Sequence, residues 1–147
     1  DLHISSSDKN LKTIYEGCDN LCNSLQILNH IQDCKKDFLS MDRVYIPTEY
    51  FEKEGLQIDC LKRDKSCDKF QKIKLKCLVN VDKLLMESYE KISLIKNRRL
   101  KKETFVIYFI AKKLTNLLKI SDPIQKKVKL SFIDLIFSFI KGIIKGI

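Results

Sequence analysis

The sequence contains little of what a catalytic site usually requires. It has two histidines, His3 and His30, no glycine-rich phosphate-binding loop and no Cys-x2-Cys pair. General acid–base catalysis needs a histidine or closely held carboxylates, and zinc sites need closely spaced cysteine pairs. We therefore expect no catalytic residue, no metal and no cofactor, and we predict that the protein is not an enzyme.

Alanine and glycosylation sites are also scarce. Alanine occurs once, at Ala111, and no Asn-x-Ser/Thr site is present, so N-glycosylation is not expected. Alanine is the strongest helix former, and its near absence serves no purpose in folding. We attribute it to codon bias in an AT-rich genome.

The charge is divided unevenly along a chain of 147 residues, a length that suits a single domain over 1–147. Residues 1–60 carry six Lys/Arg against eleven Asp/Glu, and residues 61–147 carry twenty-two against eight. The basic half could attract anionic lipid or an acidic protein; we do not expect nucleic acid as the partner. The simplest interpretation is a solvated lysine surface.

The cysteines predict a secreted protein with three disulfides, because so small a chain has few histidines to help bind a metal. The start at Asp1, with neither Met nor an apolar leader, fits a signal peptide already removed. Two antiparallel helices would place Cys22 opposite Cys77 and Cys34 opposite Cys67 and would leave Cys18 and Cys60 to pair, although other connectivities are possible. The candidate disulfide residues are Cys18, Cys22, Cys34, Cys60, Cys67 and Cys77.

The stretch 18–89 resembles one helical unit written twice. A shift of 45 residues places Cys22 on Cys67 and Met41 on Met86. A period of this length is typical of a repeated helical unit. We predict a first repeat unit over 18–45 and a second over 60–89.

Apolar residues at three-to-four spacing predict helices in both units and beyond them. Ser7 or Asp8 would cap a short first helix and Gly17 would end it. Further helices are expected over 19–42, 49–54, 65–95, 103–120 and 123–145. The predicted fold is an all-α, disulfide-stapled bundle in which the duplicated unit packs on a C-terminal helical pair within 103–147.

The last predicted helix, 123–145, is apolar around most of its circumference. Such a helix is normally central in a bundle, and we expect it in the core. The alternative is a helix that lies on a membrane surface, with lysines at its polar edge. Asp134, Lys141 and Lys145 interrupt a stretch that is too short to cross a bilayer.

The densest basic run covers residues 96–102 and is expected to be an exposed connector between helices. It also fits a nuclear-import patch, a phosphate or heparin contact, or a dibasic processing site. Its candidate partner-binding residues are Lys96, Arg98, Arg99, Lys101 and Lys102.

Cys34, Tyr45 and Cys60 stand in Cys-Tyr-Cys order, and Cys77 and Tyr89 follow without a closing cysteine. In this doubled unit the chain resembles the bicycle proteins, secreted salivary effectors of aphids. The resemblance implies a protein that is delivered into host tissue and acts there by binding.

We therefore predict a secreted, non-catalytic effector that binds a host or other partner protein. One alternative is a membrane-active or lipid-binding protein that uses residues 123–147. Another is a helical, cytokine-like receptor ligand, which is an analogy at the level of fold.

Overall fold

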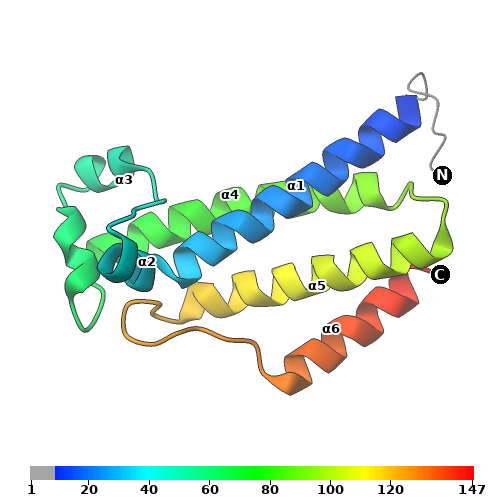
Figure 1. Ribbon diagram of the computed structural model, residues 1–147. Helices are drawn as coiled ribbons and strands as arrows, with labels where there is room; N and C mark the ends of the chain where they lie inside the picture. Colours follow the sequence, from blue (N-terminus) through cyan, green and yellow to red (C-terminus); the bar gives the residue numbers. More distant parts are fainter. Residues whose placement is uncertain (1–8) are drawn as a thin grey trace.

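The computed structural model describes residues 9–147, and within this range the protein is helical without strands (Figure 1). The elements are α1 (Lys9–Gln32), α2 (Cys34–Met41), α3 (Thr48–Lys53), the 3-10 helix η1 (Ile58–Lys62), α4 (Asp68–Ile92), α5 (Arg98–Ile120) and α6 (Phe132–Lys145). The prediction of an all-α fold is confirmed. The expected cap at Ser7 or Asp8 and the residue His3 lie outside the described residues.

The core lies between the three long helices α1, α4 and α5. Helix α1 packs along α4, both contact α5, and α6 packs against α5 (Figure 1). Apolar residues three and four positions apart place one side of each long helix in this core. Its fully buried members include Leu28, Ile31, Phe70, Ile73, Leu78, Leu85, Phe105 and Leu118. Burial of each such side chain contributes about 1.5–3 kcal/mol.

The prediction that Gly17 ends the first helix is wrong. Gly17 lies within α1, which continues to Gln32. A Cβ atom at Gly17 would lie 2.6 Å from Cβ of Lys91 and 3.2 Å from the backbone nitrogen of Ile92. The missing side chain therefore lets α1 approach the end of α4. The glycine serves helix packing rather than termination.

Helix α5 begins five residues before its predicted start, so the basic run is not a connector. The Asn97 side chain caps the helix by accepting a 3.0 Å hydrogen bond from the backbone N–H of Leu100. Arg98, Arg99, Lys101 and Lys102 consequently lie in the first turns of α5. Asn97 is a typical cap residue and could have been recognised in the sequence. The run was instead interpreted as a connector because of its charge.

Helix α6 begins at Phe132, not at Pro123. Asp122 accepts hydrogen bonds from the backbone N–H groups of Ile124 and Gln125, and this makes a turn rather than a helix. The start is set by a capping box between Ser131 and Asp134, with both side-chain-to-backbone distances at 3.1 Å.

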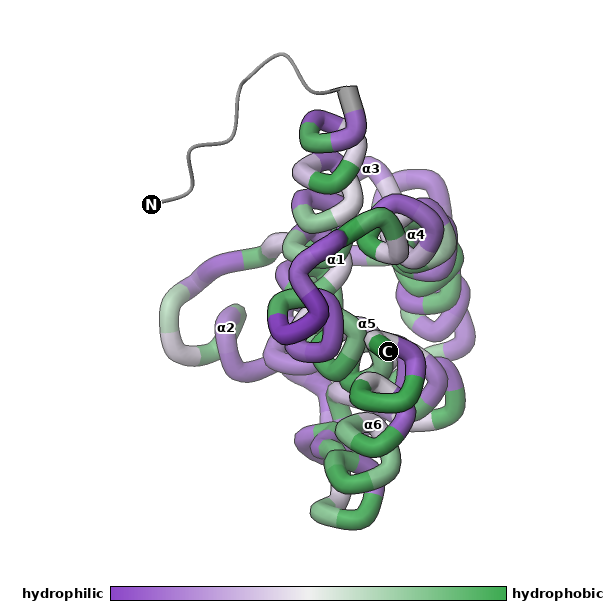
Figure 2. Tube along the Cα trace, turned by 90° about the vertical axis from the view of Figure 1, so that its right-hand side faces the viewer, coloured by the Kyte–Doolittle hydropathy of each residue, from purple (hydrophilic) through white to green (hydrophobic). Residues whose placement is uncertain are grey.

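The expectation that the last helix is central in the bundle is wrong. Within α6 only Ser138 and Gly142 are buried, and most of its Phe, Ile and Leu side chains are exposed. Apolar residues around a helix indicate that it packs against another apolar surface, but they do not identify that surface. The view in Figure 2 shows α6 as a mainly hydrophobic helix at the edge of the molecule.

The predicted disulfides are not present, because all six cysteines are free. Cys22 is exposed on α1, whereas its proposed partner Cys77 is buried in the interior, so these two thiols do not face each other. Cys34 and Cys60 are buried as well, where free cysteine packs as a small apolar residue. The predicted secreted location rested mainly on the disulfides and stays a prediction, as do the single domain and the duplication of the unit.

Replacing Ser131 by alanine should loosen the start of α6, because both halves of the capping box are lost. We expect a cost of about 1 kcal/mol, the usual effect of removing a serine cap. Faster amide hydrogen exchange in the first turn of α6 would show it. Ser131→Thr keeps the hydroxyl and serves as the control; equal exchange in the two variants would contradict the role of the cap.

Candidate functional site

A polar stripe runs along the second half of α1 and into α2. Gln26, Asn29, Asp33 and Asp37 are spaced by three, four and four residues. At 100° per residue they fall within about 80° of the helix circumference. The backbone N–H groups of Asp33 and Asp37 donate to the carbonyls of Asn29 and Asp33 at 2.9 and 2.8 Å, so the helical spacing continues across the α1–α2 junction. Two amides and two carboxylates therefore share one side of the helix.

Asp33 is the most constrained member of the stripe. Its Oδ1 lies 2.9 Å from Nζ of Lys127, and its side chain is 28% exposed. The neighbouring Gln32 donates a side-chain hydrogen bond to the carbonyl of Val128. These two contacts hold the segment that follows α5 against the end of α1.

A hollow of about 350 Å³ lies beside Asp33, between α2 and this segment. Four lysines line it together with the single carboxylate of Asp33: Lys35, Lys36, Lys126 and Lys127. Because the positive charges outnumber the negative one, the hollow favours an anionic group.

A buried lysine underlies the same end of the bundle. Lys74 of α4 is 1% exposed, and its Nζ donates a 2.6 Å hydrogen bond to the carbonyl of Ser121. Burial lowers the Lys74 pKa, although Asp122 and Cys34 oppose the shift. Burial also disfavours the charged form of Asp122, but hydrogen bonds from Ser66, Ile124 and Gln125 outweigh it and hold the Asp122 pKa below its usual value. The hydrogen bonds of Lys74 and Asp122 with backbone groups hold the loop that follows α5 in place beneath the polar stripe.

The Cys34 thiol should make the fold sensitive to alkaline pH. Burial raises its pKa from 9.0 to about 12, so the folded state keeps the proton that the unfolded chain releases. A raised folded pKa stabilises the fold fully below pH 9.0, and this stabilisation is lost as pH rises toward 12. We expect a loss on the order of 2 kcal/mol between about pH 9 and about pH 10.5.

Urea unfolding at several pH values would measure this slope. Cys34→Ala should make it shallower, although the raised pKa values of Cys60 and Cys77 keep part of the slope, whereas Cys22→Ala, which removes an exposed thiol, should leave it unchanged. Identical slopes in the two variants would show that Cys34 is not responsible.

A small pocket of about 160 Å³ opens on the other side of the stripe. The His30 and Tyr45 rings stack at one wall, with centroids 3.9 Å apart and planes within 15°. The Tyr45 hydroxyl accepts a 3.3 Å hydrogen bond from Arg43. The remaining lining is largely apolar and includes Ile27, Ile31, Ile46, Pro47, Tyr50 and Cys77. The polar stripe is therefore bordered by a space suited to a hydrocarbon group.

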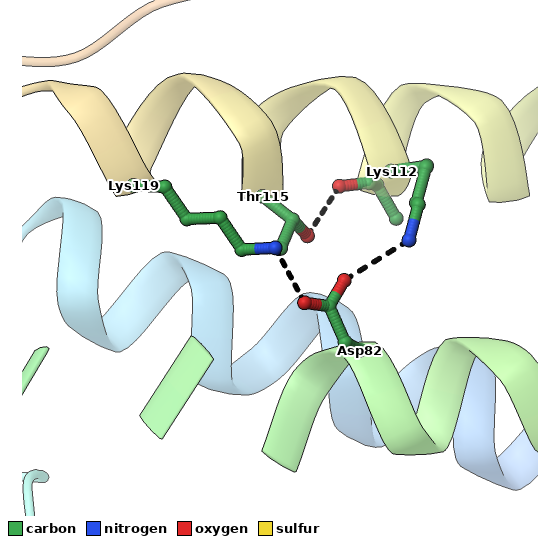
Figure 3. A network of polar contacts seen from close by, with 5 residues as sticks. Asp82, Lys112, Thr115 and Lys119 are labelled. Atoms are coloured by element: carbon green, nitrogen blue, oxygen red, sulfur yellow. Dashed lines mark hydrogen bonds and ion pairs between the residues drawn. The ribbon is translucent and has the colours of Figure 1, made fainter. Parts of the chain in front are cut away.

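A second polar cluster joins α4 to α5 away from the stripe (Figure 3). The Asp82 carboxylate lies 3.0 Å from Nζ of Lys112 and 2.5 Å from Nζ of Lys119, while Thr115 donates to the carbonyl of Ala111. Burial opposes the charged form of Asp82, but the two lysines outweigh it and lower the Asp82 pKa. Each carboxylate oxygen of Asp82 forms an ion pair with a lysine of α5, so the cluster links α4 to α5.

The residues predicted from the sequence do not form this site. The basic patch Lys96, Arg98, Arg99, Lys101 and Lys102 lies at the opposite end of α5 from the loop beneath Asp33. Among the cysteines only Cys34 belongs to the group beneath the stripe. The stripe itself was missed because α1 was interpreted by its apolar positions. The signal in the sequence was the pair of carboxylates four residues apart, preceded by two amides at helical spacings of three and four residues.

Asp33 and Asp37 alone do not complete a metal site. Magnesium takes about six oxygen ligands, often from one or two carboxylates and the phosphates of a substrate. Across residues 9–147, no three His, Cys, Asp or Glu side chains converge to hold a metal ion. The two carboxylates would need further oxygen donors, such as the phosphates of a substrate or water.

Comparison with known proteins gives a consistent result. The squalene/phytoene synthase family model matches residues 2–134. A hydroxysqualene synthase of Sinorhizobium fredii is 36% identical over 118 residues, which cover 80% of this chain and 40% of the relative. The corresponding enzyme of Rhodopseudomonas palustris is 33% identical over 130 residues, covering 86% and 43%. That of Zymomonas mobilis is 32% identical over 120 residues, covering 82% and 40%. No solved structure matches.

These findings correct the functional predictions. The chain spans about two fifths of the length of each of these relatives. The resemblance to aphid bicycle effectors is wrong, and so are the predictions of a non-catalytic effector and of a protein that is not an enzyme, because the matched proteins are synthases. Of the residues that carried the resemblance, Cys34, Cys60 and Cys77 are buried as free thiols, whereas Tyr45 is 43% exposed. The chain belongs to the squalene/phytoene synthase family.

Proposed function

We propose that this chain provides part of the reaction chamber of an enzyme that makes hydroxysqualene or a closely related long-chain isoprenoid. The observation that carries the proposal is the polar stripe Gln26, Asn29, Asp33 and Asp37 in a chain that belongs to a synthase family. The relatives are named for the product hydroxysqualene. Such a product is a long hydrocarbon with a single polar group.

The geometry beside the stripe suits a substrate that is partly anionic and partly apolar. The lysine-lined hollow next to Asp33 attracts negative charge, and the pocket at His30 and Tyr45 is apolar. In the proposed arrangement the stripe holds the polar end of the substrate between these two spaces. At about 160 Å³ the pocket takes only a fragment of a long hydrocarbon chain, so other walls of the chamber come from outside these 147 residues.

A chimera would test the proposal. In the Sinorhizobium fredii hydroxysqualene synthase, the matched segment would be replaced by the corresponding residues of this chain. We expect cells that lack their own enzyme to make hydroxysqualene when they carry the chimera, as measured by mass spectrometry of extracted lipids. The control chimera takes the matched segment of the Zymomonas mobilis enzyme, which is a relative of comparable identity.

The negative result is informative when the chimera is soluble and helical. A folded chimera that yields no hydroxysqualene, beside an active control, would contradict the proposed role of this chain. A folded chimera that makes a different isoprenoid would narrow the proposal to that product.

A further inference from the structure

One side of α6 is an unpartnered apolar surface. Seven exposed side chains form it: Phe132, Ile133, Ile136, Phe137, Phe139, Ile140 and Ile144. On a helix these positions cover about 160° of the circumference. Phe132 is 76% and Ile133 is 63% exposed. We call these seven residues the α6 apolar face.

The α6 apolar face points away from the protein because α6 is attached by its opposite, small side. Ser138, Gly142 and Gly146 are spaced by four residues, and all three are buried. A Cβ atom on Gly142 would lie 2.5 Å from the Val106 backbone, and one on Gly146 would lie 2.6 Å from Cα of Lys102. The close approach of α6 to α5 therefore leaves the large side chains on the outside.

Basic residues border the α6 apolar face. Lys113 and Lys141 line the same hollow beside Phe137, and Lys129 is exposed just before the helix begins. The other end of α6 lies against the first turns of α5, where the basic run 98–102 is found. Asp134 is the only acidic residue of α6, and Lys113 neutralises it at 2.9 Å.

This arrangement fits a helix that lies in the surface of a bilayer. The fourteen residues of α6 span about 21 Å. No helix within residues 9–147 is both long and apolar enough to cross a membrane. An apolar face bordered by lysines is typical of helices that sit at the boundary between headgroups and acyl chains, where lysine side chains reach back to the headgroups.

Charge favours lipid over a second copy of this chain as the cover. Two copies of a chain with a net charge of +9 would bring their basic borders together and repel. Anionic headgroups instead complement these lysines.

We propose that the α6 apolar face docks this protein on an anionic lipid bilayer, with α6 parallel to the membrane surface. The inference goes beyond the proposed function and does not depend on it. Lysines at the border of the face supply the preference for negative charge, and the Phe and Ile side chains enter the acyl region. No other element needs to move.

Vesicle co-sedimentation of the full chain would test the proposal. We expect binding to phosphatidylcholine vesicles that contain about one third phosphatidylglycerol, and at least about tenfold weaker binding to pure phosphatidylcholine. Binding to the anionic vesicles should weaken as salt is raised, because screening shortens the electrostatic range below about 10 Å.

Two matched pairs of variants separate the apolar and electrostatic contributions. Ile133→Gln with Ile140→Gln changes no charge and should weaken binding at least about tenfold, whereas Leu75→Gln with Met86→Gln on exposed positions of α4 should not.

In the same way, Lys129→Gln with Lys141→Gln should weaken binding, whereas the equally large charge change Lys72→Gln with Lys83→Gln on α4 should have a smaller effect. Circular dichroism would check the fold of every variant.

Unchanged vesicle binding in the Ile133/Ile140 variant would overturn the proposal. A second outcome would also overturn it: the chain does not bind anionic vesicles but forms dimers, and the Ile133/Ile140 variant is monomeric. The α6 apolar face would then be covered by a second copy of the chain. Binding that is equal for neutral and anionic vesicles would also contradict it.

Discussion

Replacing Asp33 by asparagine should reduce hydroxysqualene formation by the chimera on the order of 100-fold while leaving the fold intact. The substitution keeps the size and shape of the side chain and removes only its charge. A carboxylate would hold an anionic substrate group through a shared divalent cation, and the loss of its charge would weaken that attachment. The measurement is the rate of product formation per folded enzyme.

Asp33 also forms an ion pair with Lys127, and this contact must be separated from its proposed role. Both side chains are partly exposed, and such pairs contribute at most about 1 kcal/mol to stability. Lys127→Gln breaks the same ion pair but retains the carboxylate, so it should lower activity far less than Asp33→Asn. If the two variants lose activity equally, the ion pair and not the carboxylate is what matters.

The long helices were predictable because their core positions repeat every three to four residues. Phe70, Ile73 and Leu85 follow this spacing, and the structure buries all three at 0–1% exposure. The ends of the helices were less predictable. Asn97 and Ser131 supply caps that the sequence contains, yet a basic run and an apparent cap at Asp122 suggested other boundaries.

The function was not predictable from the same patterns. Six cysteines fit disulfides and buried free thiols equally well, and only the positions of Cys22 and Cys77 in the fold distinguish the two. Asp33 and Asp37 look like part of a solvated helix side until the hollow and the pocket beside them are known. The charged lysines of that hollow come from segments about ninety residues apart, Lys36 and Lys126, which no local pattern brings together.

The attachment of α6 depends on small residues, and we expect Gly142→Leu to detach it from α5. A leucine there would meet the Val106 backbone, since even its Cβ would lie 2.5 Å away. Backbone atoms cannot move aside as a flexible side chain can. We expect a loss of about 3 kcal/mol in the packing of α6. Amide exchange in α6 should accelerate roughly 100-fold, while exchange in the core of α4 should be unaffected.

Gly142→Ala gives the sharper test because two effects act in opposite directions. Alanine in place of glycine within a helix is worth about 1 kcal/mol in helix propensity. The added methyl group would nevertheless press on the Val106 backbone, so we expect net destabilisation of α6. Ser138→Ala, one turn earlier on the same side, removes an atom and should leave α6 attached. Stabilisation by Gly142→Ala would mean that α6 lies farther from α5, and the large apolar side chains would then have room to turn inward.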